Sequence, residues 1–250
     1  MTREPLPWPE GVDRIILDEV DSTMAEAARR ASSLVRPTWI MARHQTAARG
    51  RRGKVWSNPS GNFAATFVMK PGGSPASAAL RSFSAANALF EALAMKVNRD
   101  ALSLKWPNDV LLNGGKVAGI LLESTGRAGE IEWLSVGIGV NLRTVPGDVG
   151  RTDFPPVSLV GEGGEVCGQD EFLSILASIF ATQERLFQEF GFGHIRENWL
   201  KHAARLGEVI TARTARGDVS GTFETVDEAG HLVLLTPKGR VTIPAADVYF

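Results

Sequence analysis

Hydrophobic and polar positions in the first third of the chain predict a strand, a helix and then two more strands. Residues 13–20 alternate as a half-buried strand does. We expect strands over residues 13–20, 38–43 and 62–69. After the first strand, Ser22 and Thr23 offer caps for a helix that runs to about Leu34. Glu26 follows Thr23 at the spacing of a capping box.

Later stretches have the period of amphipathic helices. One helix is expected over residues 75–98, another over 170–190 and a shorter one over 195–204. The apolar stripe of the first comprises Leu80, Phe83, Asn87, Phe90 and Leu93, and that of the second comprises Phe172, Leu176, Ile179, Leu186 and Phe190.

The pattern then changes to short strands separated by turns. A strand is expected over residues 131–142, in which Gly137 and Gly139 either give close access to the backbone or serve the packing of the sheet. From Leu206 onward the expected strands are 209–213, 219–226, 231–236 and 241–244. Their short, regular spacing predicts a small β-barrel at the end of the chain.

The segment Lys105-Trp-Pro-Asn-Asp109 opens a hairpin that is unusually rich in charge. Asn113-Gly114 predicts a type I′ turn, which would place Asp109 opposite Ala118. Asp109 and Lys116 would then be diagonal neighbours, roughly 7–8 Å apart, with room for a ligand atom or a metal ion. Gly119 would mark a bulge or a close backbone approach. A solvated Asp–Lys pair on an exposed hairpin explains the same residues.

A second charged segment, residues 45–56, favours the ligand-binding interpretation. It places four cations in six positions, separated by Gly50 and Gly53: Arg49, Arg51, Arg52 and Lys54. Guanidinium forks and glycine backbone suit an anion. An RNA-binding patch is the alternative. With 27 Lys+Arg against 28 Asp+Glu, the net charge is −1, which favours one small, highly charged ligand over nucleic acid.

Composition sets outer limits. A chain of 250 residues supports a large domain and a small one, and 44% hydrophobic and 22% charged residues are ordinary for a soluble globular protein. The single cysteine, Cys167, excludes an internal disulfide, and no signal core or membrane-length apolar run is evident. We therefore expect a cytoplasmic protein. His194 and His202 lack metal-ligand spacing and are expected to be structural.

Taken together, these motifs resemble those of the bacterial biotin protein ligases, the biotin–[acetyl-CoA-carboxylase] ligases. The matching segments are residues 21–23, 45–56, 105–123 and 137–142. The block Lys-Trp-Pro-Asn-Asp…Gly-Lys-x-Ala-Gly-Ile-Leu-x-Glu is highly specific. Two positions depart from the family pattern: Ala48 stands where glycine is usual, and Met24 where asparagine is common.

The resemblance implies an α+β fold. A mixed β-sheet catalytic domain of the biotin/lipoate ligase type, like that of class II aminoacyl-tRNA synthetases, would cover residues 13–204, after a flexible lead-in of residues 1–12. A small C-terminal SH3-like β-barrel, residues 205–250, would help to seat ATP or the carrier protein. The loop of residues 143–156 would close over the adenylate.

The resemblance also implies an activity. The enzyme would use ATP and Mg²⁺ to activate biotin as biotinyl-5'-AMP and pass it to a lysine of a biotin carboxyl carrier protein. The catalytic residues would be Lys116, Asp109 and Arg51, with Lys105 supporting Asp109. The biotin-binding residues would be Ser22, Thr23, Met24, Gln45, Arg49, Gly50, Arg51, Lys116 and Gly119. The ATP- and adenylate-binding residues would be Arg49, Lys54, Trp56, Asn108 and Asn141. Of these, Asn108, Lys54 and Asn141 would contact the ATP phosphates or their magnesium, and no direct protein ligand of the metal is assigned.

Related activities form the alternatives. Lipoate ligases and octanoyltransferases resemble this family in architecture, but a thioester route needs an activated thiol. Cys167 has the acidic neighbours Asp170 and Glu171, which raise a thiol's pKa. Because the motif at Ser22 comes so early, we expect no DNA-reading helix-turn-helix domain and no operator binding. Homodimers occur in the family.

Overall fold

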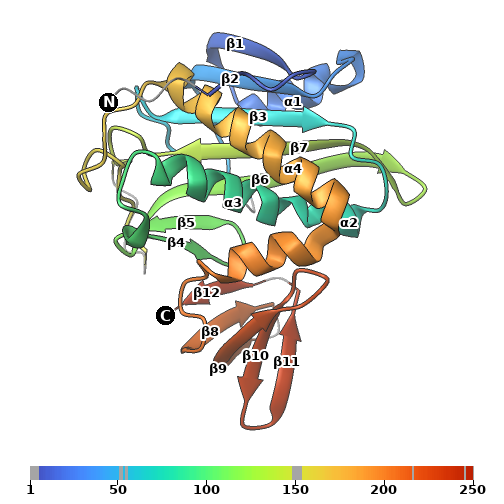
Figure 1. The fold of residues 1–250 in the computed structure, drawn as a ribbon, viewed down its shortest axis with the longest axis vertical. Helices are drawn as coiled ribbons and strands as arrows, with labels where there is room; N and C mark the ends of the chain where they lie inside the picture. The colour runs from blue at the N-terminus through green and yellow to red at the C-terminus, as the bar shows by residue number, and fades with distance from the viewer. Residues whose placement is uncertain are drawn as a thin grey trace.

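The computed structural model describes residues 6–50, 53, 56–147, 154–215, 217–244 and 246–249. These residues form a seven-stranded sheet and a separate five-stranded sheet (Figure 1). The larger sheet has the order β1 (Asp13–Val20), β2 (Thr38–Gln45), β3 (Phe63–Met69), β7 (Glu130–Val140), β6 (Gly115–Arg127), β5 (Asp109–Leu112) and β4 (Leu102–Lys105). Only the β1–β2 pair is parallel, so the sheet is mixed, as expected.

Helices cover both faces of this sheet. Along β2, Trp39 and Met41 join the main core under α3 (Arg81–Ala94) and α4 (Gln169–Leu200), whereas Ile40 joins a smaller cluster on α1 (Thr23–Arg30). Successive side chains of a strand point to opposite faces, so α1 lies on the face opposite α3 and α4. Figure 1 shows α3 and α4 crossing one face of the sheet.

The first helix is shorter than its sequence predicts. It ends at Arg30 and passes into a 3₁₀ turn, Ala31–Ser33, so the predicted end at Leu34 is wrong. Ser22 caps it by accepting a hydrogen bond from the Met24 N–H. Glu26 does not complete a capping box, because its carboxylate binds Arg29 and Arg30 instead.

The expected helix over residues 75–98 is two helices, α2 (Pro75–Ala79) and α3 (Arg81–Ala94). It stops early because Asn98 caps a 3₁₀ turn that leads into β4.

The expected helices over 170–190 and 195–204 are the two halves of α4, which is broken at Gly191 (φ 71°) and ends at Leu200. Phe190 was predicted in the core, but it is 58% exposed just before this break.

The second sheet is antiparallel and lies beyond the β4–β5 end of the first (Figure 1). Its order is β11 (Gly239–Ile243), β10 (Leu232–Thr236), β9 (Gly217–Val226), β8 (Val209–Thr214) and β12 (Asp247–Tyr249). Four strands confirm the predicted ones. The fifth, β12, was missed because three residues are too short to show a period. None of the described helices combines the length and apolarity needed to cross a bilayer.

Candidate functional site

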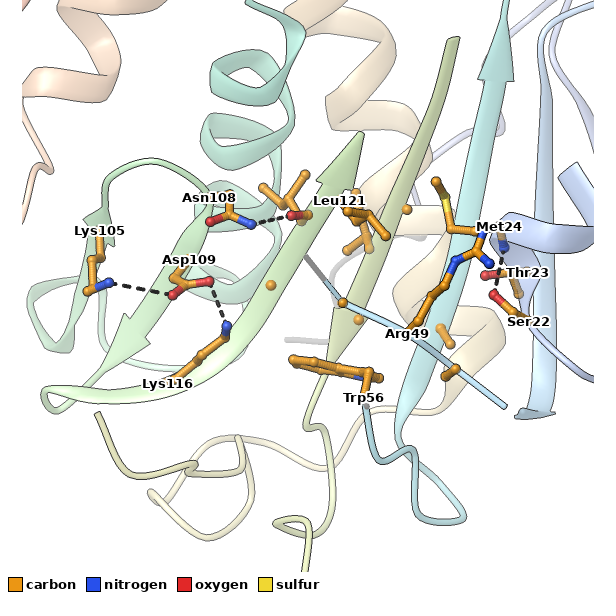
Figure 2. A pocket seen from close by; sticks show the side chains of 18 of the residues that line it. Ser22, Thr23, Met24, Arg49, Trp56, Lys105, Asn108, Asp109, Lys116 and Leu121 are labelled. Carbon is orange, nitrogen blue, oxygen red and sulfur yellow. Dashed lines mark hydrogen bonds and ion pairs between the residues drawn. The ribbon is translucent and has the colours of Figure 1, made fainter. Parts of the chain in front are cut away.

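A cavity of about 310 Å³ opens between the two sheets and collects most of the predicted site residues. Figure 2 shows Ser22, Thr23 and Met24 at one side of it, and Asp109 between two lysines at the other. Predicted residues that line it are Ser22, Thr23, Met24, Gln45, Arg49, Gly50, Trp56, Asn108, Asp109, Lys116 and Gly119, with Lys105 and Ala48.

The α1 side of the cavity is a buried polar network. Gln45 Oε1 accepts hydrogen bonds from the Thr23 N–H (2.8 Å) and hydroxyl (3.2 Å), and the Thr66 hydroxyl donates to Thr23 Oγ1 (2.9 Å). Ser22, Thr23 and Gln45 are each more than nine-tenths buried. The start of α1 and the end of β2 therefore present fixed donors and acceptors to a ligand.

Three glycines form the floor of the cavity, and larger side chains lie directly on them. A Cβ at Gly137 would be 2.6 Å from Met24 Sδ, and one at Gly139 would be 2.7 Å from the Trp56 ring. Gly119 likewise lies under Lys116 and Trp56, with Cβ distances of 3.3 and 3.4 Å to them. Side chains, not another backbone segment, therefore approach Gly119.

The hairpin that carries Asp109 is built differently from the prediction. Asn113 (φ 50°) and Gly114 (φ 80°) form the expected turn, but Asp109 pairs with Gly119, not with Ala118. A bulge between Val110 and Leu111 shifts the register by one residue. The predicted pairing is wrong because a bulge leaves one residue of a strand unpaired.

The predicted gap between Asp109 and Lys116 is also wrong. Lys116 Nζ lies 2.7 Å from Asp109 Oδ1, and Lys105 Nζ lies 3.7 Å from Oδ2, so the carboxylate sits between two ammonium groups (Figure 2). Oδ1 is buried and accepts no hydrogen bond from a described residue, so its contact with Lys116 is one of charge. Lys105 is only 7% exposed and lies beside Asp109, and its role of supporting this carboxylate stays a prediction.

Residues 154–157 hold the backbone of Lys116 in place. The Lys116 N–H donates to the Pro155 carbonyl (2.9 Å), and the Val157 N–H donates to the Lys116 carbonyl (3.0 Å). Phe154, which also lines the cavity, places its ring 4.5 Å from Lys105 Nζ. The positions of Lys116 and Lys105 thus depend on residues 154–157. No local sequence pattern predicts this contact.

Asn141 does not line the cavity. It is 2% exposed, and its side-chain nitrogen donates to the Val157 carbonyl (3.0 Å), so it holds the same segment in place. Asn108 does line the cavity, where its amide nitrogen donates to the Ile120 carbonyl.

Part of the basic loop can be located. Arg49 lies 3.3 Å from both Glu123 oxygens, and both side chains are about half exposed. Arg51 and Lys54, predicted to contact biotin and ATP, lie outside the described residues.

Comparison with known proteins assigns the family. Residues 16–141 match the biotin/lipoate A/B protein ligase family, and residues 206–250 match the biotin protein ligase C terminal domain. A biotin–[acetyl-CoA-carboxylase] ligase of Paracoccus denitrificans is 49% identical over 239 residues, which cover 94% of this chain and 99% of the relative. The chain belongs to the biotin protein ligases.

Other relatives agree with this assignment. The bifunctional ligase/repressor of Bacillus subtilis is 28% identical over 247 residues, 94% of this chain and 73% of that protein. Among solved structures, the biotin protein ligase of Aquifex aeolicus in complex with biotin and ATP has a TM-score of 0.78 at 26% identity. The match covers 94% of this chain and 97% of that chain, which confirms the predicted fold class.

In this biotin protein ligase, Cys167 is not an activated nucleophile. It is buried away from the cavity, and burial together with Glu171 raises the pKa of its thiol to about 12. Such a thiol stays protonated at neutral pH. The described residues also contain no group of three His, Cys, Asp or Glu side chains that could hold a metal ion.

Some lining residues were not predicted. Phe154 follows a loop, and Asp247, Val248 and Tyr249 belong to β12 in the other sheet. No motif marks them, because only the packing of the two sheets brings β12 to the cavity.

Proposed function

We propose that this protein is an ATP-dependent ligase that converts biotin to biotinyl-5'-AMP and transfers it to a lysine of a biotin carboxyl carrier protein. The observation that carries the proposal is one cavity with a neutral polar network at one side and Lys116, Asp109 and Lys105 at the other. The Paracoccus relative is named as a ligase acting on acetyl-CoA carboxylase, and the Aquifex structure contains biotin and ATP.

The polar network suits the head group of biotin. A ureido ring has N–H donors and a carbonyl acceptor, which match Ser22, Thr23 and Gln45. Met24, 4% exposed, supplies apolar contact for the rest of the bicycle. With the ureido ring bound to this network, the biotin carboxylate would point toward Lys116.

The first reaction joins two anions. The biotin carboxylate oxygen attacks the α-phosphorus of ATP, a new P–O bond forms, and pyrophosphate leaves with the electron pair of the broken bond. Lys116 stabilises the charge that builds on both groups, and positioning the two anions lowers the barrier further. Arg49 at the rim, with Arg51 and Lys54 of the same loop, would offset the charge of the phosphates.

Mg²⁺ is part of the proposal and would enter with ATP. Magnesium prefers oxygen ligands and is held mainly by substrate phosphates, where it neutralises their charge. The cavity fits this mode, because Asp109 is already paired with two lysines and Asn108 supplies a side-chain oxygen of the type that magnesium takes.

The second reaction transfers biotin to the carrier. The lysine amine attacks the carbonyl carbon of the mixed anhydride, an amide bond forms, and AMP leaves. The attacking amine must lose a proton, which passes to solvent or to the departing AMP phosphate. Asp109, held between Lys116 and Lys105, would orient the amine as it attacks.

Pyrophosphate exchange into ATP tests the activity. Biotin, lipoate and octanoate are supplied in turn to the same enzyme, with Mg²⁺. Exchange that depends on biotin alone is expected. Exchange with lipoate or octanoate but not with biotin would assign the neighbouring activity, and the absence of exchange with any acid would reject the proposal.

We also propose the cellular setting. A free, buried Cys167 fits a reducing cytoplasm, and a net charge of −1 does not favour operator DNA.

β1 is the outer strand of the larger sheet, so its edge is available to a second copy in a homodimer. Residues 13–204 and 205–250 would be the catalytic and C-terminal domains. Sedimentation and a gel-shift assay test the dimer and the absence of DNA binding.

A further inference from the structure

Trp106 belongs to the most specific motif of the chain, yet it does not line the cavity. It lies between Lys105 and the turn with Asn108 and Asp109, is 3% exposed, and is turned toward the C-terminal sheet. Its indole N–H donates to the carbonyl of Gly230 (3.0 Å). One residue of the active-site hairpin is therefore bonded directly to the other sheet.

The turn that accepts this hydrogen bond is well ordered by its own contacts. Asp227 Oδ1 accepts from the Ala229 N–H (2.9 Å) and the His231 N–H (2.8 Å), and the Gly230 N–H donates to the Asp227 carbonyl (3.0 Å). Gly230 has φ 81°, and a Cβ there would lie 3.0 Å from both Leu80 and Phe83. The turn thus presses against the catalytic domain.

The same sheet carries a wall of the cavity. The turn joins β9 to β10, β9 pairs with β8, and β8 pairs with β12. Asp247 and Tyr249 of β12 line the cavity that contains Lys105 and Asp109 (Figure 1 shows β12 facing the β4–β5 end of the large sheet). These ladders connect the turn to β12, so holding the turn restrains this wall of the cavity.

We propose that Trp106 is a positioning residue that locks the C-terminal sheet in the place where β12 closes the cavity. The motif then has two linked tasks: Lys105, Asn108 and Asp109 face the substrates, and Trp106 fixes the opposite wall relative to them. Loss of the indole N–H leaves the catalytic groups intact but lets the β12 wall move.

The chain offers a direct reporter, because Tyr249 is its only tyrosine. Protein labelled with 3-fluorotyrosine gives one ¹⁹F resonance from β12. Trp106→Phe keeps an aromatic ring but removes the donor, so we expect its resonance to shift or broaden in the absence of ligand. Trp39→Phe is the matched control: Trp39 is 1% exposed, packs on Phe67 and Phe180, and does not line the cavity. Its resonance should stay at the wild-type position.

A second variant covers the case in which Trp106→Phe fails to fold. Asp227→Ala removes the carboxylate that organises the turn without opening a core cavity, and we expect it to move the Tyr249 resonance in the same way. An unchanged resonance in every folded variant at Trp106 and Asp227 would overturn the proposal, as would an equal change in Trp39→Phe.

The kinetic part of the test rests on the proposed ligase function. In biotin-dependent pyrophosphate exchange, Trp106→Phe should raise the KM for ATP several-fold, because ATP must then bind to a cavity whose β12 wall is no longer held in place, with kcat nearly unchanged. An unchanged KM would count against the proposal. A wild-type enzyme without exchange, but with the expected ¹⁹F changes, would reject the ligase function and leave the positioning role intact.

Discussion

At the scale of single residues, the chemistry depends on a carboxylate shared by two lysines of different exposure. Lys116 approaches Asp109 from the cavity, with a side chain 30% exposed, whereas the Lys105 side chain is 8% exposed and caps the other oxygen. The aspartate and the two lysines could be predicted from the motif. The direct contact between Asp109 and Lys116 could not, because it depends on a bulge that no local sequence pattern marks.

Lys116→Ala should reduce biotin-dependent pyrophosphate exchange by about 100-fold or more, the loss typical of one removed transition-state donor. Lys238→Ala, at an exposed turn outside the cavity, is the control and should be fully active. The two variants should have equal melting temperatures within about 2 °C. Normal exchange by a folded Lys116→Ala enzyme would contradict the assigned role.

Gly137→Ala should weaken biotin binding about tenfold, because the new methyl group would push Met24 from the floor into the ligand space. Gly147→Ala has open space around its Cβ and should bind normally. Calorimetric titration with biotin measures both. The double variant Gly137→Ala/Met24→Ala should recover part of the affinity, and failure to do so would show that the loss has another cause.

At the scale of elements, the residue that caps α1 also belongs to the proposed biotin site, whereas the residue that caps α2 does not. Ser22→Ala removes the hydrogen bond to Met24 N–H and should cost about 1 kcal/mol of stability while weakening biotin binding. Ser74→Ala removes the equivalent cap of α2, the bond to Ser77 N–H, and should cost a similar amount without changing biotin affinity. Denaturant unfolding and biotin titration of both variants separate the two effects.

The helices α3 and α4 are joined by a buried ion pair. Arg81 and Glu184 are 5% and 11% exposed, and the guanidinium binds both carboxylate oxygens. Glu184→Gln should lower the free energy of unfolding by up to about 3–5 kcal/mol, because it leaves a buried charge unpaired. Replacing both residues by methionine should cost much less. Urea unfolding checks this, and equal losses in the single and double variants would contradict it.

Element boundaries were predictable only where local chemistry sets them. The Asn113-Gly114 turn followed from the need for positive φ, and β1 was predicted over its full length. The break of α4 at Gly191 was predicted too, since the expected helices end at residue 190 and resume at 195. The end of α3 was missed, because Asn98 caps a 3₁₀ turn there. A one-dimensional period does not contain that information.

At the scale of the whole molecule, carboxylates paired with arginine or lysine should make the fold sensitive to acid. The pKa is lowered for Asp21 by Arg29, for Glu26 by Arg30, for Glu171 by Lys96 and for Glu224 by Arg240. Each folded-state pKa lies below its unfolded-state value. The stabilisation is therefore complete above the unfolded-state pKa and is lost as pH falls through the folded-state pKa.

The melting temperature should accordingly begin to fall as the pH drops below about 4, near the ordinary pKa values of these groups, and should continue to fall at lower pH. Because most of these pairs are exposed, high salt should reduce the effect. Glu26→Gln should lower the melting temperature at neutral pH and reduce its further decrease at acid pH. Thermal unfolding of both proteins from pH 3 to pH 7 measures this, and an acid limb unchanged by salt and by the variant would refute it.

The amino-acid sequence by itself determined the family motifs, most helices and strands of the large sheet, four of the five C-terminal strands and the charged and polar residues predicted at the cavity. The elements follow from periodicity and turn chemistry, which are local properties, whereas the mixed sheet and the site residues follow from the resemblance to the biotin protein ligases. Only the tertiary structure decided that Asp109 touches Lys116, that Asn141 holds residues 154–157 instead of lining the cavity, that Trp106 bonds to the Gly230 turn and that β12 of the other sheet lines the cavity. Those contacts join residues far apart in the chain, so they exist only after the two sheets have packed.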